Sequence, residues 1–229
     1  MIVLAGGFGT RLSGVISDVP KPMAPIGNKP FLDILLSSLS GQGVTKVVLS
    51  VGYMADVIQR YFGDQQHGME ILYSVENEPL GTGGAIRAGL ELCEGKIAFV
   101  LNGDTLVDVN LESLQCLWNR EKSPIMVTRE VTNAERYGSV TVKDDRIISF
   151  APKGISAERA LINAGFYLIP TDLLNYYEIG EVFSFEKDFL PLAIKVKEFL
   201  TFRHVGYFID IGIPEDYEKA QIELGRLDV

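Results

Sequence analysis

Three glycines follow the first apolar run of the chain, at positions Gly6, Gly7 and Gly9. The apolar run, residues 2–4, predicts a short buried strand that ends in this glycine-rich loop. Glycine has no Cβ and tolerates positive φ, so several backbone N–H groups of such a loop can converge on one anion. The loop is therefore predicted to bind phosphate.

Two cationic side chains stand close to this loop in the sequence. Arg11 follows the glycines, and Lys21 stands between Pro20 and Pro22. Proline fixes its own φ and restricts the residue before it, so Lys21 is expected in a confined, extended segment. Positive charge beside a loop of converging amides predicts a site for a nucleoside triphosphate.

Two established phosphate-loop patterns do not fit this stretch. The P-loop pattern requires Lys-Ser or Lys-Thr after the glycines, and neither is present there. The dinucleotide pattern G-x-G-x-x-G fits Gly7 and Gly9 but has Leu12 where its third glycine belongs. A glycine-rich turn after an edge strand, without any ligand, is the structural alternative.

Two aspartates have the sequence context of metal ligands. Asp104 follows the apolar run 96–101, and Asp210 interrupts the apolar run 208–211. A buried carboxylate is costly unless it is paired or bound to metal. Mg²⁺ takes oxygen ligands, a few from protein and the rest from water and phosphate. The alternative for Asp104 is an ordinary turn or cap residue at a strand end.

The first loop, read as L-A-G-G-x-G-T-R-L and followed by P-K-P, resembles the signature of the sugar-1-phosphate nucleotidyltransferases. The resemblance implies that a sugar 1-phosphate attacks the α-phosphorus of a nucleoside triphosphate and that pyrophosphate leaves. It implies catalytic roles for Arg11, Lys21 and Asp104, with Mg²⁺ held by Asp104 and Asp210. The nucleotide-binding residues that it implies are Leu4, Ala5, Gly6, Gly7, Gly9, Thr10, Arg11, Lys21, Glu76, Gly81, Thr82 and Asp104.

The segment from Glu76 to Ala85 resembles the base-binding segment of the same family. Gly81 is expected to pass close to the base, and Thr82 to begin the next helix as its N-cap. Glu76 matches the base-reading position, where relatives for thymine or uracil nucleotides often have glutamine. A carboxylate only accepts hydrogen bonds, and guanine offers two adjacent donors, so we predict GTP. The alternative is that Glu76 is a solvated loop residue.

Three motifs of the second half resemble the sugar-phosphate site of the family. They are R-Y-G ending at Gly138, N-x-G-x-Y beginning at Asn163, and S-x-E-x-D around Glu186. The resemblance implies these sugar-phosphate contacts: Gly138, Lys153, Asn163, Glu186 and Lys187. Pro152 replaces the usual glutamate beside Lys153, so one sugar contact is expected to be missing or moved.

Several activities are compatible with these motifs. The P-K-P-M-A-P-I and E-P-L-G-T-G-G-A-I segments look most like guanylyltransferases for a heptose 1-phosphate, whose product feeds bacterial surface polysaccharide. Enzymes for mannose 1-phosphate come next, then uridylyltransferases for another sugar 1-phosphate. Two other classes are a non-catalytic subunit that binds nucleotide or sugar phosphate, and a glycosyltransferase of similar α/β form. The latter usually has a D-x-D motif, which Asp104-Thr105-Leu106 does not supply.

The hydrophobic pattern predicts the elements that must position these residues. Strands are expected at 2–4, 46–51, 70–75 and 96–101, with helices at 31–39, 53–62 and 82–93 between them. This alternation predicts a mostly parallel sheet with helices on its faces. Ligands of such sheets bind beyond the carboxyl ends of the strands, so the glycine loop and Asp104 are expected to be neighbours.

After residue 110 the predicted elements change in kind. We expect a helix at 111–120, strands at 124–131, 138–142, 146–150 and 160–169, a hairpin of 199–204 with 207–211 through Gly206, and a helix at 214–224. The predicted fold is one α/β, Rossmann-like nucleotidyltransferase domain over 1–229, with a central mixed, mostly parallel sheet flanked by helices. Its nucleotide-binding half spans about 1–110 and its sugar-phosphate-binding half about 111–229.

Composition excludes some partners. The 229 residues carry a formal charge of −9, which argues against a nucleic-acid groove. No apolar run approaches the ~20 residues of a membrane helix, and Met1 leads directly into the first strand, so no signal peptide is expected. Cys93 and Cys116 are expected as reduced, mostly buried helical thiols, which favours the cytoplasm. The expected partners are the two substrates and a second copy of the chain in a homodimer.

Overall fold

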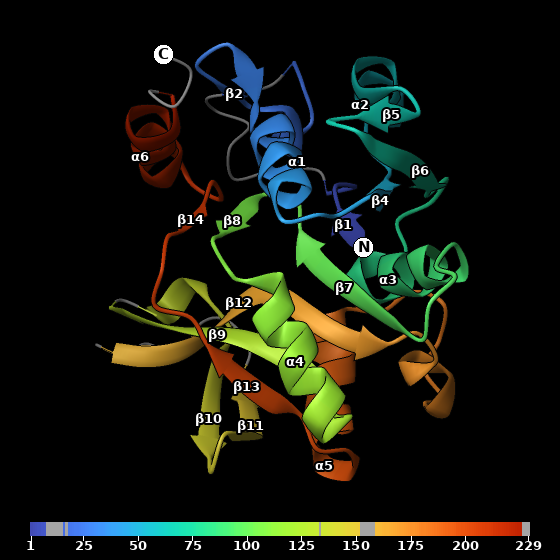
Figure 1. Cartoon of the computed structure of the whole chain (residues 1–229), viewed down its shortest axis with the longest axis vertical. Helices are drawn as coiled ribbons and strands as arrows, with labels where there is room; N and C mark the ends of the chain where they lie inside the picture. The colour runs from blue at the N-terminus through green and yellow to red at the C-terminus, as the bar shows by residue number, and fades with distance from the viewer. Residues whose placement is uncertain (8–15, 17, 133, 152–158, 226–229) are drawn as a thin grey trace.

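Figure 1 shows the computed structural model, which describes residues 1–7, 16, 18–132, 134–151 and 159–225. Gly9, Thr10, Arg11 and Lys153, which are predicted above to contact substrates, lie outside the described residues, as does Pro152.

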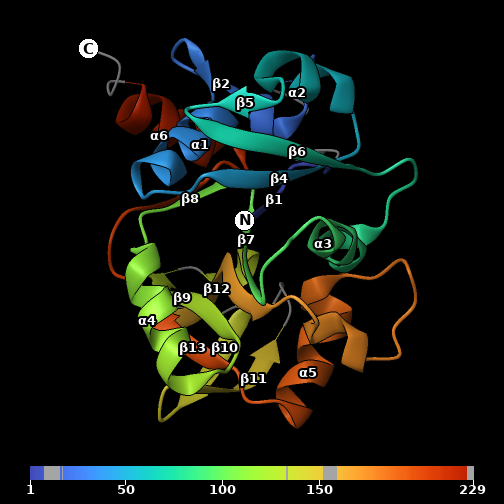
Figure 2. The same ribbon diagram turned by 45° about the vertical axis from the view of Figure 1, so that its right-hand side comes forward.

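The first half of the described chain alternates strands and helices as predicted. Its elements are β1 (Ile2–Leu4), β2 (Pro25–Ile26), β3 (Lys29–Pro30), α1 (Phe31–Gly41), β4 (Lys46–Val51), α2 (Ala55–Phe62), β5 (Gln65–Gln66), β6 (Met69–Val75), α3 (Gly81–Glu91), β7 (Ile97–Asn102) and β8 (Thr105–Val107). β1 pairs in parallel with β4 and β7, and β4 pairs in parallel with β6. Helices α1 and α2 cover one face of these strands and α3 covers the other (Figure 2). The predicted parallel core is therefore confirmed.

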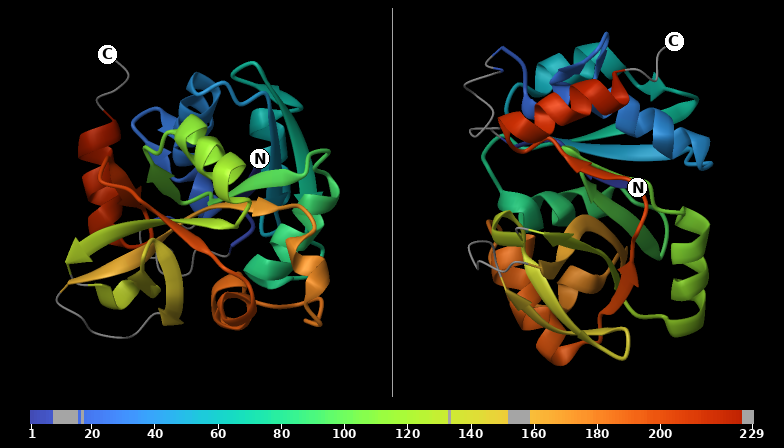
Figure 3. Two further views of the ribbon diagram at one scale, coloured as in Figure 1. Left: turned by 60° about the horizontal axis from the view of Figure 1, so that its bottom comes forward. Right: turned by 90° about the vertical axis from the view of Figure 1, so that its left-hand side faces the viewer.

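The second half of the described chain adds strands that are mostly antiparallel. Its elements are α4 (Leu111–Glu121), β9 (Ile125–Thr132), β10 (Ser139–Lys143), β11 (Arg146–Ala151), β12 (Arg159–Pro170), a π-helical turn (Phe185–Phe189), α5 (Leu190–Val196), β13 (Leu200–Arg203), β14 (Phe208–Asp210) and α6 (Pro214–Leu224). β12 pairs antiparallel with both β7 and β9 and so joins the two halves. Among the described residues one mixed sheet runs in the order β10-β11-β13-β9-β12-β7-β1-β4-β6-β5. Figure 3 shows the two halves packed on each other from two further sides.

The predicted hairpin of residues 199–204 with 207–211 is wrong. β13 lies parallel to β9, with Leu200 opposite Ile125, and β14 instead pairs antiparallel with β8. The two strands pair with distant segments instead of with each other. β13 joins the large sheet beside β9, and β14 forms a separate two-stranded sheet with β8. This second pairing brings the end of β14 back to the first half of the chain.

The core consists of apolar side chains on both faces of the sheet. Phe31, Leu36 and Leu49 belong to one buried cluster, and Phe185 and Phe189 to the other. The cysteine prediction is partly wrong, because Cys93 follows α3 and is only half-buried, and Cys116 is exposed on α4. Within the described residues, no helix has the length and apolar character that crossing a bilayer requires.

Candidate functional site

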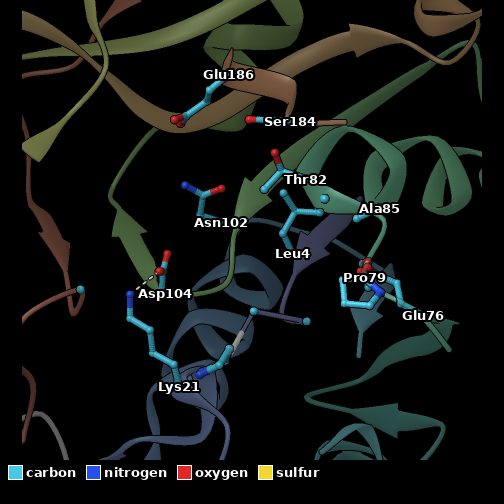
Figure 4. Close-up of a pocket in the computed structure, with 16 residues that line it drawn as sticks. Leu4, Lys21, Glu76, Pro79, Thr82, Ala85, Asn102, Asp104, Ser184 and Glu186 are labelled. Carbon is cyan, nitrogen blue, oxygen red and sulfur yellow. Dashed lines mark hydrogen bonds and ion pairs between the residues drawn. The ribbon is translucent and has the colours of Figure 1, made fainter. Parts of the chain in front are cut away.

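A cleft of about 450 Å³ opens beyond the carboxyl ends of β1, β4 and β7 (Figure 4). This is the edge of the sheet at which the sequence predicts a ligand. The described lining residues are Leu4, Gly6, Gly7, Lys21, Pro22, Ser50, Glu76, Pro79, Gly81, Thr82, Ala85, Asn102, Asp104, Ser184, Glu186 and Gly212. Figure 4 shows three separate polar ends: Lys21 with Asp104, Glu76 beside Pro79, and Glu186 near Ser184.

The first end joins one ammonium group to two carboxylates. Lys21 Nζ donates a hydrogen bond to Asp104 Oδ2 and lies 3.9 Å from Asp210 Oδ1. Lys21 follows Pro20, whose backbone is extended, and opens a short 3₁₀ turn that buries Pro22. Its side chain is only 14% exposed, so the charge is held inside the cleft. The confinement of Lys21 is therefore confirmed, but the extended backbone predicted for it is wrong: only Pro20 is extended, and Lys21 already belongs to the 3₁₀ turn.

Pairing of β8 with β14 brings the two aspartates together. Asp210 is in register with Thr105, and Ile211 N donates to the carbonyl of Asp104 at 3.0 Å. Asp104 is positioned from the other side as well, because Gly103 N donates to the carbonyl of Leu4 at 2.9 Å. Residues from the start, middle and end of the chain therefore meet at one point, as the sequence predicts.

Glycine is required beside this point. A Cβ on Gly212 would lie 2.7 Å from Asp210 Oδ1, and a Cβ on Gly103 would lie 2.7 Å from the carbonyl oxygen of Leu4. The first contact is with the end of a flexible side chain, and the second is with backbone. A side chain at position 212 would therefore move the Asp210 carboxylate, whereas one at position 103 would strain the loop itself.

Both acidic and basic groups act on Tyr137, which lies near the two aspartates. Burial, together with the charges of Asp210, Asp216 and Asp104, raises the pKa of Tyr137 to about 12, although Arg136 acts in the opposite sense. Arg136 is itself held by Asp216 at 2.5 Å, in an ion pair between α6 and the turn before β10.

The donor set fits a divalent ion of hard character. Among the described residues, no group of three or more His, Cys, Asp or Glu side chains is arranged to hold a metal. The two neighbouring carboxylates, Asp104 and Asp210, would therefore supply part of the coordination. Phosphate oxygens and water would complete it, as is usual for Mg²⁺.

The second end of the cleft holds Glu76 in place. Ser50 Oγ donates to Glu76 Oε1 at 3.2 Å, and Leu80 N donates to Glu76 Oε2 at 3.0 Å. Gly6 makes room for this carboxylate, because a Cβ there would lie 3.0 Å from Oε1. The alternative of a solvated loop residue is therefore wrong. Each oxygen accepts one protein hydrogen bond and keeps a lone pair for a ligand.

The third end is built on Asn163. Its Nδ2 donates to Glu186 Oε1 at 2.9 Å and to the Tyr167 hydroxyl at 2.5 Å, and its Oδ1 accepts from Gly165 N at 3.0 Å. Burial, and then the nearby charge of Glu186, raises the pKa of Tyr167 well above its ordinary value. The phenol is therefore neutral at all ordinary pH. Glu186 faces the cleft, while Asn163 orients it from behind.

Other predicted residues lie away from the cleft lining. Gly138 is buried, and its carbonyl accepts from Asn163 N at 2.8 Å. Lys187 is exposed on the π-helical turn. Ala5 is buried and donates its amide to the carbonyl of Ser50 at 2.7 Å. Thr82, by contrast, lines the cleft, but its side chain does not cap α3 and instead accepts from Phe185 N at 2.9 Å.

Sequence reasoning did not assign four polar or small residues that line the cleft. They are Ser50, Asn102, Ser184 and Gly212. Ser50 and Asn102 stand at the carboxyl ends of parallel strands, which is a usable sequence signal. Ser184 and Gly212 reach the cleft only because the second half of the chain folds back onto the first, which no local sequence signal indicates.

Comparison with known proteins agrees with this geometry. A family model described as nucleotidyl transferase matches residues 1–226. The chain is similar to D-glycero-alpha-D-manno-heptose 1-phosphate guanylyltransferases of Aneurinibacillus thermoaerophilus, at 44% identity with 97% of both chains covered, and of Campylobacter jejuni, at 44% identity with 94% and 96% covered. Crystal structures of HddC from Yersinia pseudotuberculosis, alone and complexed with GMP-PN, match with a TM-score of 0.85 at 38% identity, covering 97% of this chain and 98% of that one.

Proposed function

Because the chain belongs to the nucleotidyl transferase family, we propose that it transfers a guanylyl group from GTP to D-glycero-α-D-manno-heptose 1-phosphate and releases pyrophosphate. The observation that carries this proposal is the arrangement of one cleft, with Lys21, Asp104 and Asp210 at one end and a fixed Glu76 at another. The likeness to heptose 1-phosphate guanylyltransferases over nearly the whole of both chains supports the choice of sugar.

The reaction needs no nucleophile from the enzyme. A phosphate oxygen of the sugar 1-phosphate forms a bond to the α-phosphorus of GTP, and the bond from that phosphorus to the pyrophosphate oxygen breaks. Positioning and neutralisation of charge carry such transfers. Lys21 draws the two reacting phosphates together, and Arg11 neutralises the departing pyrophosphate. Mg²⁺, held by Asp104 and Asp210, supplies charge neutralisation at the phosphate oxygens when it is bound.

Glu76 is proposed to read the base. Guanine presents N1–H and its 2-amino group side by side, and a carboxylate can accept from both. Uracil and thymine present one donor between two carbonyls, which an ionised Glu76 would repel. Ser50 and Leu80 N hold the carboxylate rigidly, so the discrimination does not depend on a mobile side chain.

Replacing Glu76 with glutamine is expected to relax this preference. The amide presents a donor where guanine also donates, so kcat/KM for GTP should fall about tenfold to a hundredfold, which is the cost of one mismatched buried hydrogen bond. The ratio of UTP or dTTP to GTP turnover should rise. Glu78→Gln is the matched control, because Glu78 is exposed two residues away. An unchanged preference in Glu76→Gln would remove Glu76 from base recognition.

Replacing Gly212 with alanine is expected to disable the site without unfolding the protein. The new methyl group would push the Asp210 carboxylate aside, and misplacement by about 1 Å can cost ~10² in turnover. The melting temperature should stay close to wild type, because only the end of a side chain must move. Gly41→Ala is the control, since its added Cβ would meet no atom within 4 Å outside its chain neighbours and the backbone of its own helix. Normal turnover in Gly212→Ala would show that Asp210 need not keep its place.

The proposed function is tested by pyrophosphate release from a matrix of GTP, CTP, UTP and dTTP against several sugar 1-phosphates with Mg²⁺. Highest kcat/KM with GTP and the heptose 1-phosphate is expected. A higher value with mannose 1-phosphate, or with UTP, would correct the substrate and keep the mechanism. If no pair of substrates released pyrophosphate, the protein would be a non-catalytic subunit that binds nucleotide or sugar phosphate. Sugar transfer from a ready-made sugar nucleotide to an acceptor would instead indicate a glycosyltransferase.

We also propose a domain organisation, a cellular location and an oligomeric state for the enzyme. One sheet passes through both halves, which supports a single nucleotidyltransferase domain over 1–229. The cysteines among the described residues are free thiols, which suits the cytoplasm. We propose a homodimer, and light scattering on the purified protein would measure its mass.

A further inference from the structure

The glycine-rich start of α3 packs against a segment from the other half of the chain. A Cβ on Gly81 would lie 2.5 Å from the carbonyl oxygen of Phe183, and one on Gly83 would lie 2.1 Å from the Phe183 ring. A Cβ on Gly84 would lie 2.5 Å from the carbonyl oxygen of Glu181. Because these glycines have no Cβ, the segment 181–183, which leads into the sugar-phosphate end of the cleft, can pack directly against the start of α3.

Hydrogen bonds fasten the two segments together. Phe183 N donates to the carbonyl of Leu80 at 3.0 Å, and Gly83 N donates to the carbonyl of Phe183 at 2.9 Å. Phe185 N donates to the Thr82 hydroxyl oxygen at 2.9 Å. Leu80 N also donates a hydrogen bond to Glu76 Oε2, so this series of hydrogen bonds begins at Glu76, the residue proposed to read the base.

Thr82 makes the last of these bonds next to a functional carboxylate. Phe185 is buried, stacks on Phe189 at 4.9 Å between ring centroids and meets the edge of Tyr167 at 5.0 Å. The Phe185 amide donates to the Thr82 hydroxyl oxygen. Glu186 is the next residue, and its side chain is held by Asn163. Thr82 fixes the backbone of the turn, and Asn163 fixes the carboxylate.

We infer that Thr82 is a positioning residue for the sugar-phosphate end of the cleft, acting through Phe185 N on Glu186 from the first turn of the nucleotide-side helix. This inference rests on the proposed function. The resemblance implies a nucleotide contact for Thr82, but its hydroxyl oxygen accepts from Phe185 N. Losing the hydroxyl would loosen the attachment to α3 of the turn that carries Glu186, although the hydrogen bonds of Ser184 within the turn would remain. The hydrogen bonds of Glu76 would stay in place. The consequence is a defect confined to one substrate.

The test compares KM values for the two substrates in Thr82→Val, which keeps the shape of the side chain and removes the hydroxyl. With GTP saturating, KM for D-glycero-α-D-manno-heptose 1-phosphate should rise about tenfold, the effect of one lost hydrogen bond to a buried amide. With the sugar 1-phosphate saturating, KM for GTP should change less than about threefold. Thr82→Ser should return the sugar KM to near wild type.

Thr171→Val is the matched control, because the Thr171 hydroxyl donates to the carbonyl of Gly95 and does not line the cleft. Equal increases in both KM values, or an unchanged sugar KM, in Thr82→Val would overturn the inference. So would a failure of Thr82→Ser to recover. Wild-type enzyme that releases no pyrophosphate from GTP and the heptose 1-phosphate would instead reject the proposed function, so the two failures are distinguishable.

Discussion

Replacing Lys21 with alanine is expected to lower turnover by ~10² or more, by comparison with the loss of one preorganised charge donor from an active site. The Lys21 side chain is only 14% exposed; its ammonium pairs with Asp104 and lies 3.9 Å from Asp210 Oδ1. A charge that is largely shielded from water acts on phosphate more strongly than one in bulk solvent. Steady-state pyrophosphate release, at saturating GTP and sugar 1-phosphate, measures the effect on kcat.

Lys143→Ala is the matched control for this prediction, because Lys143 is exposed at the end of β10 and lines no part of the cleft. Its turnover should equal that of the wild type. Lys21→Arg keeps the charge and changes its shape, so an intermediate value is expected. Near-normal turnover in Lys21→Ala would remove Lys21 from the mechanism.

Replacing Asp104 with asparagine is expected to lower turnover by about 10³, because a metal contributes several kcal/mol of charge stabilisation to phosphoryl chemistry. Asparagine keeps the size of the side chain and removes its negative charge, so the fold around Leu4 and Ile211 should persist. Mn²⁺ affinity, followed by electron paramagnetic resonance, should fall together with turnover. This second readout does not depend on catalysis.

Asp108→Asn is the control for the metal prediction. Asp108 lies four residues further along, is exposed and lines no part of the cleft. Both its Mn²⁺ affinity and its turnover should match the wild type. If Asp104→Asn bound Mn²⁺ as tightly as the wild type, the metal would have to be held elsewhere.

The local elements could be predicted well because their signals are local. The valine-rich run Lys46–Val51 and the proline-initiated helix Pro214–Leu224 have the expected bounds. The meeting of Asp104 with Asp210 was predicted from the family resemblance, since the cost of a buried carboxylate predicts that it has a partner but not which one. The catalytic role of Arg11 stays a prediction, since Arg11 lies outside the described residues.

The wrong predictions concern features that depend on contacts between segments far apart in the sequence. Nothing near residues 199–211 indicates that β13 finds β9 and that β14 finds β8, so a local turn at Gly206 suggested a hairpin. Thr82 has the sequence context of an N-cap, but its hydroxyl is taken by Phe185 N, 103 residues away. Gly81 was predicted to pass close to the base, whereas a Cβ at this position would lie 2.5 Å from the carbonyl oxygen of Phe183. Contacts of this range cannot be read from one sequence.

A crystal structure of the protein with Mn²⁺ and a non-hydrolysable GTP analogue tests the central claim most directly. We predict an anomalous Mn²⁺ peak at about 2.0–2.3 Å from carboxylate oxygens of both Asp104 and Asp210, with the polyphosphate beside Lys21 and the guanine edge on Glu76. A metal bound to only one of these aspartates, or a guanine placed away from Glu76, would contradict the account.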